Sequence, residues 1–177
     1  MLHASKNDYD WLGHGMYFWE NNFLRALHFA QELQKRPQKG KKPIREPAVL
    51  GAVIDLGFCL DLLEKEFIDA ARESFATVRD SYAALEVSLP ENISLGSSKD
   101  RLIRRLDCAV IEHMRFRMRR KIKRPFDSVR AAFIEGEPLY PTAGFYEKSH
   151  IQLCICNPNC VKGFFIPRIE DKNWPMP

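Results

Sequence analysis

The spacing of apolar residues changes along this chain of 177 residues. Up to about residue 121, apolar side chains recur every three or four positions in three long stretches, whereas short apolar runs follow from residue 126 onward. A period of 3.6 residues is typical of helices and a period of two is typical of strands. The change predicts an α+β protein whose strands gather toward the C-terminal side.

Three helices are expected, over residues 22–35, 62–85 and 100–121. Asn21 or Asn22 is suited to cap the first helix, Asp61 is suited to cap the second, and Pro37 ends the first pattern. Short apolar runs predict strands at the N-terminal residues 2–5 and at 48–56, 129–134, 151–156 and 161–166. With no internal repeat, residues 1–177 are expected to form a single domain.

The composition restricts the cellular setting. No apolar run approaches the length of a bilayer span, and the N-terminus lacks the layout of a signal peptide. The five cysteines are an odd number, which favours a reducing compartment over a disulfide framework. A cytoplasmic protein that does not enter membranes is therefore expected.

The net charge of +4 is modest, but the positive residues form two groups, at residues 35–45 and 115–124. Cations at the end of a helix complement the helix dipole, and charged runs are commonly solvated surfaces. The two groups also suit phosphates, either those of a dinucleotide or those of a nucleic acid. The sequence leaves these interpretations open.

The segment 12–20 combines glycine with aromatic residues. Gly13 and Gly15 flank a histidine, and Tyr17, Phe18 and Trp19 follow directly. Glycine lets the backbone approach a ligand closely, and aromatic side chains offer flat faces for stacking. The alternative is an aromatic cluster that follows a tight turn and is buried as core.

Together with His3-Ala4-Ser5 and a following helix that contains Arg25-Ala26-Leu27-His28, this segment resembles ADP-ribosyltransferases of the diphtheria-toxin and poly-ADP-ribose-polymerase type. Their motifs are His-Gly-Ser/Thr and Gly-x-Gly-Ile-Tyr-Phe-Ala. Almost the whole chain also resembles bacterial and phage-associated proteins with a Trp-Leu-Gly-x-Gly-x-Tyr-Phe-Trp-Glu segment and a late Thr/Ser-His-Ile-Gln segment. The resemblance implies a split antiparallel sheet with flanking helices, and NAD as the substrate.

The resemblance also implies the roles of individual residues. His3 bonds a ribose hydroxyl, the backbone of Ala4 bonds the carboxamide, and Tyr17 stacks on nicotinamide, so that Tyr17, Gln152 and His3 form the catalytic set. The NAD-binding set comprises His3, Ala4, Ser5, Gly15, Tyr17 and Arg25, with Arg25 directed to a phosphate. For Ser5, a local backbone cap is the alternative.

Gln152 stands where the family has a glutamate. On a strand, His150 and Gln152 share the face opposite Ile151, so they project toward a cleft if the apolar face meets the core. An amide can orient the ribose but cannot balance the positive charge that grows as the glycosidic bond breaks. The substitution predicts slow mono-ADP-ribosylation, NAD hydrolysis or no turnover, unless a carboxylate of the adjoining loop supplies the charge. The candidates for this carboxylate are Glu135, Glu137 and Glu147. The alternative is that these three are ordinary surface groups.

The loop 136–148 precedes this strand, and the resemblance gives such a loop the role of recognising the target. Its candidate residues are Tyr140, Phe145, Tyr146 and Glu147. The alternative is that the aromatic residues seal the core. His150, Cys154, Cys156 and Cys160 lack the paired Cys-x-x-Cys spacing of structural zinc sites, so no metal is expected.

The expected function is that of a glycosyltransferase acting on NAD, a mono-ADP-ribosyltransferase that modifies a protein or a nucleic acid. The resemblance suggests a toxin or defence effector, with a cognate inhibitor protein as a partner. The alternative is a catalytically inactive protein of the same fold that binds a nucleotide or RNA. A structural interaction module is a third reading.

Overall fold

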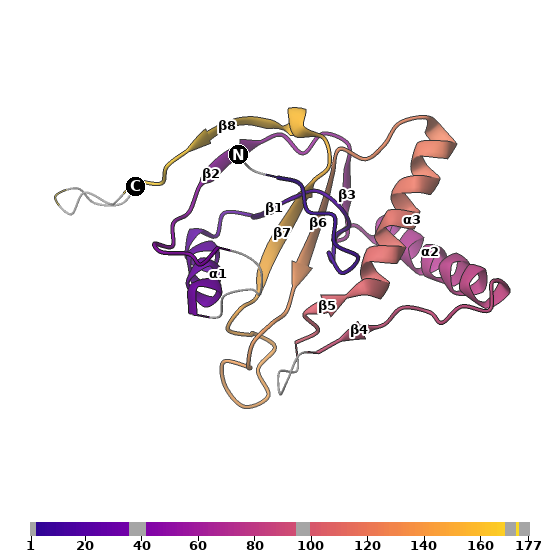
Figure 1. The fold of residues 1–177 in the computed structure, drawn as a ribbon, viewed down its shortest axis with the longest axis horizontal. Coiled ribbons are helices and arrows are strands. Elements are labelled where there is room, and N and C mark those ends of the chain that lie inside the picture. The colour runs from indigo at the N-terminus through magenta and orange to yellow at the C-terminus, as the bar shows by residue number, and fades with distance from the viewer. Residues whose placement is uncertain (1–2, 36–41, 95–99, 169–172, 174–177) are drawn as a thin grey trace.

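The computed structural model describes residues 3–35, 42–94, 100–168 and 173. Within these residues it contains three α-helices together with strands in small sheets, which confirms the α+β class. The helices are α1 (Phe23–Lys35), α2 (Lys65–Ala84) and α3 (Arg105–Ile122). Figure 1 shows α1 at one side of the main sheet and the pair α2 and α3 at the other.

The main sheet has four strands in the order β1-β7-β6-β3. These are β1 (Met16–Trp19), β7 (His150–Ile155), β6 (Ser128–Phe133) and β3 (Cys59–Asp61). The sheet is mixed, because β3 runs parallel to β6 whereas the other pairs are antiparallel. Both outer strands come from the first half of the chain, so the expected gathering of strands at the C-terminal side describes only the centre of the sheet.

Two pairs of strands complete the described structure. In the first pair, β2 (Gly51–Ile54) lies beside β8 (Val161–Phe165), and a short 3-10 helix, η1 (Pro158–Cys160), precedes β8. In the second pair, β4 (Asn92–Ile93) lies beside β5 (Ile103–Arg104). The expected N-terminal strand is reduced to a bridge between Ser5 and Gly15. No helix in the described ranges is both long enough and apolar enough to span a bilayer.

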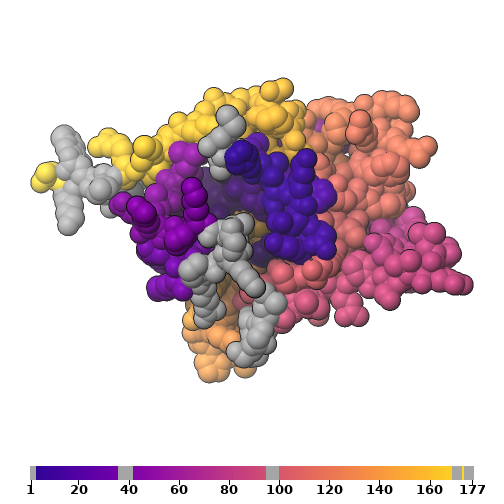
Figure 2. All heavy atoms as spheres, in the orientation of Figure 1, coloured from indigo at the N-terminus to yellow at the C-terminus, as the bar shows by residue number. Residues whose placement is uncertain are grey.

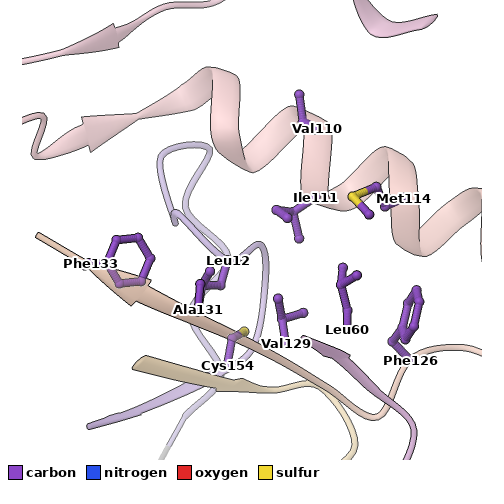
Figure 3. Close-up of a cluster of buried hydrophobic side chains, with 10 residues drawn as sticks. All are labelled: Leu12, Leu60, Val110, Ile111, Met114, Phe126, Val129, Ala131, Phe133 and Cys154. Atoms are coloured by element: carbon purple, nitrogen blue, oxygen red, sulfur yellow. The ribbon is translucent and has the colours of Figure 1, made fainter. Parts of the chain in front are cut away.

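The larger core lies between the sheet and the helices α2 and α3. Val129 and Ala131 on β6 and Cys154 on β7 point toward Ile111 and Met114 of α3, as Figure 3 shows. The fully buried side chains of Leu60, Val129 and Cys154 mark its centre. This packing buries one face of the main sheet against a helical layer.

The opposite face of the sheet is also covered. Leu153 and Ile155 of β7 pack with Met16 and Phe18 of β1, and the β2–β8 pair supplies Ile54 and Val161. Both faces of β7 are therefore buried, so the alternation on this strand does not separate a core face from an open cleft. His150 and Gln152 are only 7% and 5% exposed.

The second helix begins later than its apolar pattern predicts. Asp61 ends β3 instead of capping a helix, and Glu64 occupies the N-cap position without a side-chain bond. The Asp61 carboxylate accepts a hydrogen bond from the Leu63 backbone N–H at 3.0 Å and pairs with Arg130 at 2.8 Å. Pairing with β6 therefore overrides the helical period at residues 61–63.

Candidate functional site

Tyr17 braces the turn that precedes β1. Its hydroxyl accepts a hydrogen bond from the Leu12 N–H at 2.9 Å and donates one to the Gly13 carbonyl at 2.8 Å. Burial is the main reason why the pKa of Tyr17 lies far above its ordinary value. The hydroxyl is thus engaged within the protein, while other atoms of Tyr17 line a groove beside α1.

The two glycines of this turn serve internal contacts. Gly13 has a φ of 76°, a left-handed conformation that glycine adopts readily. A Cβ atom on Gly15 would lie 2.5 Å from the Cys154 Sγ and 2.7 Å from the Ile155 carbonyl oxygen. Gly15 therefore permits close contact with β7, which agrees with the interpretation of this turn as part of the core.

β1 and β7 place the two central residues of the resemblance on adjacent strands. Tyr17 pairs with Cys154 and Trp19 pairs with Gln152, so all four side chains share one sheet face. Tyr17 and Gln152 are therefore diagonal neighbours on this face, and residues in that relation typically lie about 7–8 Å apart.

The first turn of α1 directs Arg25 toward the same region. The Asn22 side chain accepts a hydrogen bond from the Arg25 N–H at 3.0 Å, as expected of a helix cap. The Arg25 guanidinium lies 3.5 Å from the Glu135 carboxylate, and these side chains are 11% and 3% exposed. Glu135 follows β6 and is buried, so its interpretation as a surface carboxylate is wrong.

These elements bring five polar side chains together in what we call the buried polar cluster: Trp19, Arg25, Glu135, His150 and Gln152. The Trp19 and His150 rings lie 6.4 Å apart, and Trp19 pairs with Gln152. Seven buried side-chain nitrogen or oxygen atoms of the described residues lack a hydrogen-bond partner, and all except the Nδ1 of His113 belong to this cluster. An unsatisfied buried polar atom costs about 1–3 kcal/mol, so this concentration marks a site suited to a polar ligand.

The buried polar cluster offers both donors and acceptors. The His150 Nδ1 lies 2.6 Å from the Lys148 carbonyl oxygen, which only accepts, so Nδ1 carries the proton and Nε2 is an acceptor in the neutral ring. Burial lowers the pKa of His150 and, together with the charges of Arg25 and Arg104, favours this neutral form. The other unpaired acceptors are Glu135 Oε1 and Gln152 Oε1, and the donors are Trp19 Nε1 and the Nε and Nη1 of Arg25.

The charges within the cluster oppose each other. Burial raises the pKa of Glu135, and the positive charge of Arg25 lowers it in part. The nearby Arg104 guanidinium lies 4.4 Å from the centre of the Trp11 ring and 5.1 Å from that of Phe133, whose ring also contacts His150. Phe133 and Arg104 thus border the cluster on the side of His150.

A groove of about 910 Å³ runs beside this region, between β1, α1 and β2. Trp19 and Phe29, whose rings lie 5.0 Å apart, line it next to the cluster. Pockets for small molecules commonly span about 300–1,000 Å³, so this groove has room for a dinucleotide. Figure 2 shows a hollow between the indigo N-terminal segment and the purple α1.

The N-terminal residues of the resemblance lie apart from Gln152. Ser5 exchanges two backbone hydrogen bonds with Gly15, which places this segment on the edge of β1 that faces away from β7. His3 and Ala4 are exposed. The Ser5 hydroxyl accepts a hydrogen bond from the Asn7 side chain at 2.8 Å. This bond is local, but it joins two side chains and is not the backbone cap that was the alternative for Ser5.

The loop before β7 projects from the molecule as a small hairpin (Figure 1), closed by a bridge between Pro138 and Tyr146. Tyr140 and Phe145 are 56% and 66% exposed, so they do not seal the core. Tyr146 is half-buried, and Glu147 is exposed, as is Glu137. The loop therefore presents two aromatic side chains to solvent.

Sequence reasoning missed three members of this site. The sequence predicts stacking by the Trp19 ring, but the unpaired group is its indole N–H. It places His150 beside Gln152 without a chemical role, whereas the His150 Nε2 is an unpaired acceptor. It does not distinguish Glu135 from the other two loop carboxylates. The alternation on β7 is a signal for His150, whereas no local pattern separates Glu135 from Glu137. Among the described residues no group of three or more potential ligands is arranged to hold a metal ion.

The chain matches no protein-family model, no curated protein and no solved structure. Function therefore rests on the chemistry of the buried polar cluster and its surroundings.

Proposed function

We propose that the protein is a mono-ADP-ribosyltransferase that binds NAD against the buried polar cluster. The observation that carries the proposal is the concentration of unpaired donors and acceptors around Gln152 and Arg25, two residues that the resemblance assigns to NAD. Ribose hydroxyls donate and accept, the carboxamide does both, and the pyrophosphate accepts from a guanidinium. NAD thus satisfies each kind of unpaired atom in the cluster.

Glu135 is the carboxylate in this proposal that compensates for the neutral Gln152. The bond between the ribose carbon and nicotinamide breaks, its electron pair leaves with nicotinamide, and positive charge grows on the ribose. A preorganised carboxylate in a site that excludes water stabilises such charge strongly. The acceptor atom then attacks the ribose carbon and releases a proton, for which Glu135, with its raised pKa, is the base.

Gln152, His150 and Tyr17 have positioning roles in this scheme. The Gln152 Oε1 and the His150 Nε2 accept hydrogen bonds from ribose hydroxyls and hold the sugar against Glu135. Tyr17 presents its groove-lining atoms to nicotinamide, while its hydroxyl keeps the turn in place. His3, which is exposed and lies apart from Gln152, has no role in this scheme.

The test is nicotinamide release from NAD labelled in both the nicotinamide and the adenylate, with cell lysate as the source of acceptor. Wild type is compared with Glu135→Gln and with Glu137→Gln, which changes an exposed carboxylate two positions away. We expect Glu135→Gln to lower release on the order of 100-fold and Glu137→Gln to leave it unchanged. Unfolding temperatures identify any loss that comes from misfolding.

Two outcomes would contradict the proposal. The first is an absence of nicotinamide release by folded wild type, and the second is equal release by wild type and Glu135→Gln. Transfer of the adenylate label to protein or, in a form sensitive to RNase, to RNA identifies the class of acceptor. Label that remains on free ADP-ribose indicates NAD hydrolysis instead.

A nucleotide-binding protein without turnover is the second candidate. The neutral amide of Gln152 and the internal hydrogen bonds of the Tyr17 hydroxyl favour it, because both remove groups from the reacting centre. This candidate predicts saturable NAD binding by calorimetry, weakened by Gln152→Ala, with no nicotinamide release.

A further inference from the structure

The C-terminal part of α3 and the turn after it carry an excess of positive charge at the surface. We call this region the basic helix end; its residues are Arg117, Arg119, Arg120, Lys121, Lys123 and Arg124. All six are exposed. Of these six residues only Arg124 forms an ion pair within the described part of the chain, at 3.4 Å from Asp127, and the nearby Glu112 pairs with Arg115. The other five cations have no carboxylate partner among the described residues.

The helix dipole does not account for this number of cations. Its field is confined to the last turn of a helix, and α3 ends at Ile122. Arg117 lies a full turn earlier, and its spacing from Arg120 and Lys121 places like charges side by side. Such pairs destabilise a helix slightly, so folding does not favour this arrangement.

An aromatic side chain lies within the basic helix end. Phe116 is 56% exposed, and the Arg120 guanidinium lies 5.5 Å from the centre of its ring. The apolar face of the same helix, with Ile111 and Met114, is already buried in the core. Phe116 therefore lies on the solvent side, with the Arg120 guanidinium over its ring.

We propose that the basic helix end binds single-stranded RNA. Cations along a helix neutralise successive phosphates, and an exposed ring flanked by arginine stacks on an unpaired base. A duplex hides its base faces, which leaves Phe116 without a partner. A membrane surface requires an open apolar helix face, which α3 does not have. Figure 2 shows this end of α3 at the upper right, where no part of the described chain covers it.

This inference goes beyond the proposed transferase activity, because RNA binding at α3 requires no NAD. It is tested without NAD, by the fluorescence polarisation of a labelled oligouridylate over a series of salt concentrations. The logarithm of the affinity for a single strand falls linearly with the logarithm of the salt concentration. The slope is about 0.7 for each phosphate that the protein neutralises. The double variant Arg117→Gln/Lys121→Gln is expected to reduce the slope by about 1.4.

Phe116→Ala tests stacking separately from charge. It is expected to weaken binding roughly 10-fold while leaving the salt slope unchanged. The matched control is Lys65→Gln/Arg72→Gln on α2, which removes the same charge from side chains that are 85% and 78% exposed. Unfolding temperatures of all variants verify that each remains folded.

Several results would overturn the inference. They are affinity that does not depend on salt, equal effects of the α3 and α2 double variants, and binding of duplex RNA as tight as that of the single strand. Tighter binding of an oligodeoxythymidylate than of the ribose strand would overturn the assignment to RNA. Nicotinamide release by the same variants is measured in parallel, so a failure here is distinguishable from a failure of the transferase proposal.

Discussion

The buried polar cluster and the basic helix end both hold polar groups without partners, but at opposite extremes of exposure. In the cluster, Arg25 and Glu135 oppose each other in charge, and both are shielded from water. At the basic helix end the charges have one sign, and water solvates all of them. The same property, a missing partner, therefore has a large energetic cost in one place and a small one in the other.

This difference decides how each region points to a ligand. An unpaired buried atom is costly by itself, so six in one cluster are informative without any further pattern. A solvated cation costs almost nothing, so the basic helix end is informative only through its density of charge and the exposed Phe116. Substitutions in each region test this difference.

The largest effect is expected for Arg25→Met. The variant leaves the Glu135 carboxylate buried and unpaired, which typically costs about 3–5 kcal/mol of the free energy of unfolding. Urea unfolding measures it. Arg72→Met, whose side chain is 78% exposed, is the surface control and should change stability by less than about 0.5 kcal/mol. Similar losses in the two variants would erase the contrast between the regions.

Gly15→Ala tests how closely the turn beside the cluster is packed. The new Cβ would lie 2.5 Å from the Cys154 Sγ and 2.7 Å from a backbone oxygen, so we expect a loss of about 1–3 kcal/mol. Gly163→Ala on β8 meets nothing within 4 Å and is the matched control. If both substitutions have equally small effects in thermal unfolding, the close approach of the turn to β7 is wrong.

The pH dependence of stability tests the burial of Glu135. Its pKa is raised in the folded protein, mainly by burial, so the folded state holds this proton more tightly than the unfolded state. Stability contributed by the protonated carboxyl is therefore lost as pH rises from the ordinary pKa through the raised one. Relative to Glu135→Gln, wild type should become less stable over that window, by about 1.4 kcal/mol for each pKa unit of the shift. A difference that stays constant with pH would show that the carboxylate is solvated.

The smallest effect on stability is expected for Arg117→Gln/Lys121→Gln. Removing a like-charge pair should stabilise the helix by about 0.2–0.5 kcal/mol at low salt, and added salt should abolish this gain. Thermal unfolding at two ionic strengths measures it. A loss of several kcal/mol would mean that these side chains hold the fold together, which is incompatible with a solvated binding surface.

Local patterns in the chain account for the elements around the site. Helical spacing predicted α1, α2 and α3, the asparagine cap predicted the start of α1, and short apolar runs predicted β2, β6, β7 and β8. The turn before β1 agrees with the alternative interpretation of the glycine segment. These features depend on neighbours a few residues apart, and such neighbours are visible in a sequence.

The short strands β3 and β5 could not be recognised in this way. β3 has three residues and β5 has two, too few for a period to appear, and each exists because a partner strand lies beside it. For the same reason, residues 61–63 leave the helical pattern to which their spacing assigns them. The predicted helices 62–85 and 100–121 therefore begin three and five residues too early.

The α+β class and the presence of His150 and Gln152 on one face of one strand follow from local patterns in the sequence. The burial of both faces of this strand, the bracing of a turn by Tyr17, and the contact of Arg25 with Glu135 instead of Glu137 or Glu147 depend on the tertiary structure. Arg25 and Glu135 are separated by 110 residues along the chain. Spacing reports only on near neighbours, whereas the burial of a carboxylate depends on every segment that excludes water from it.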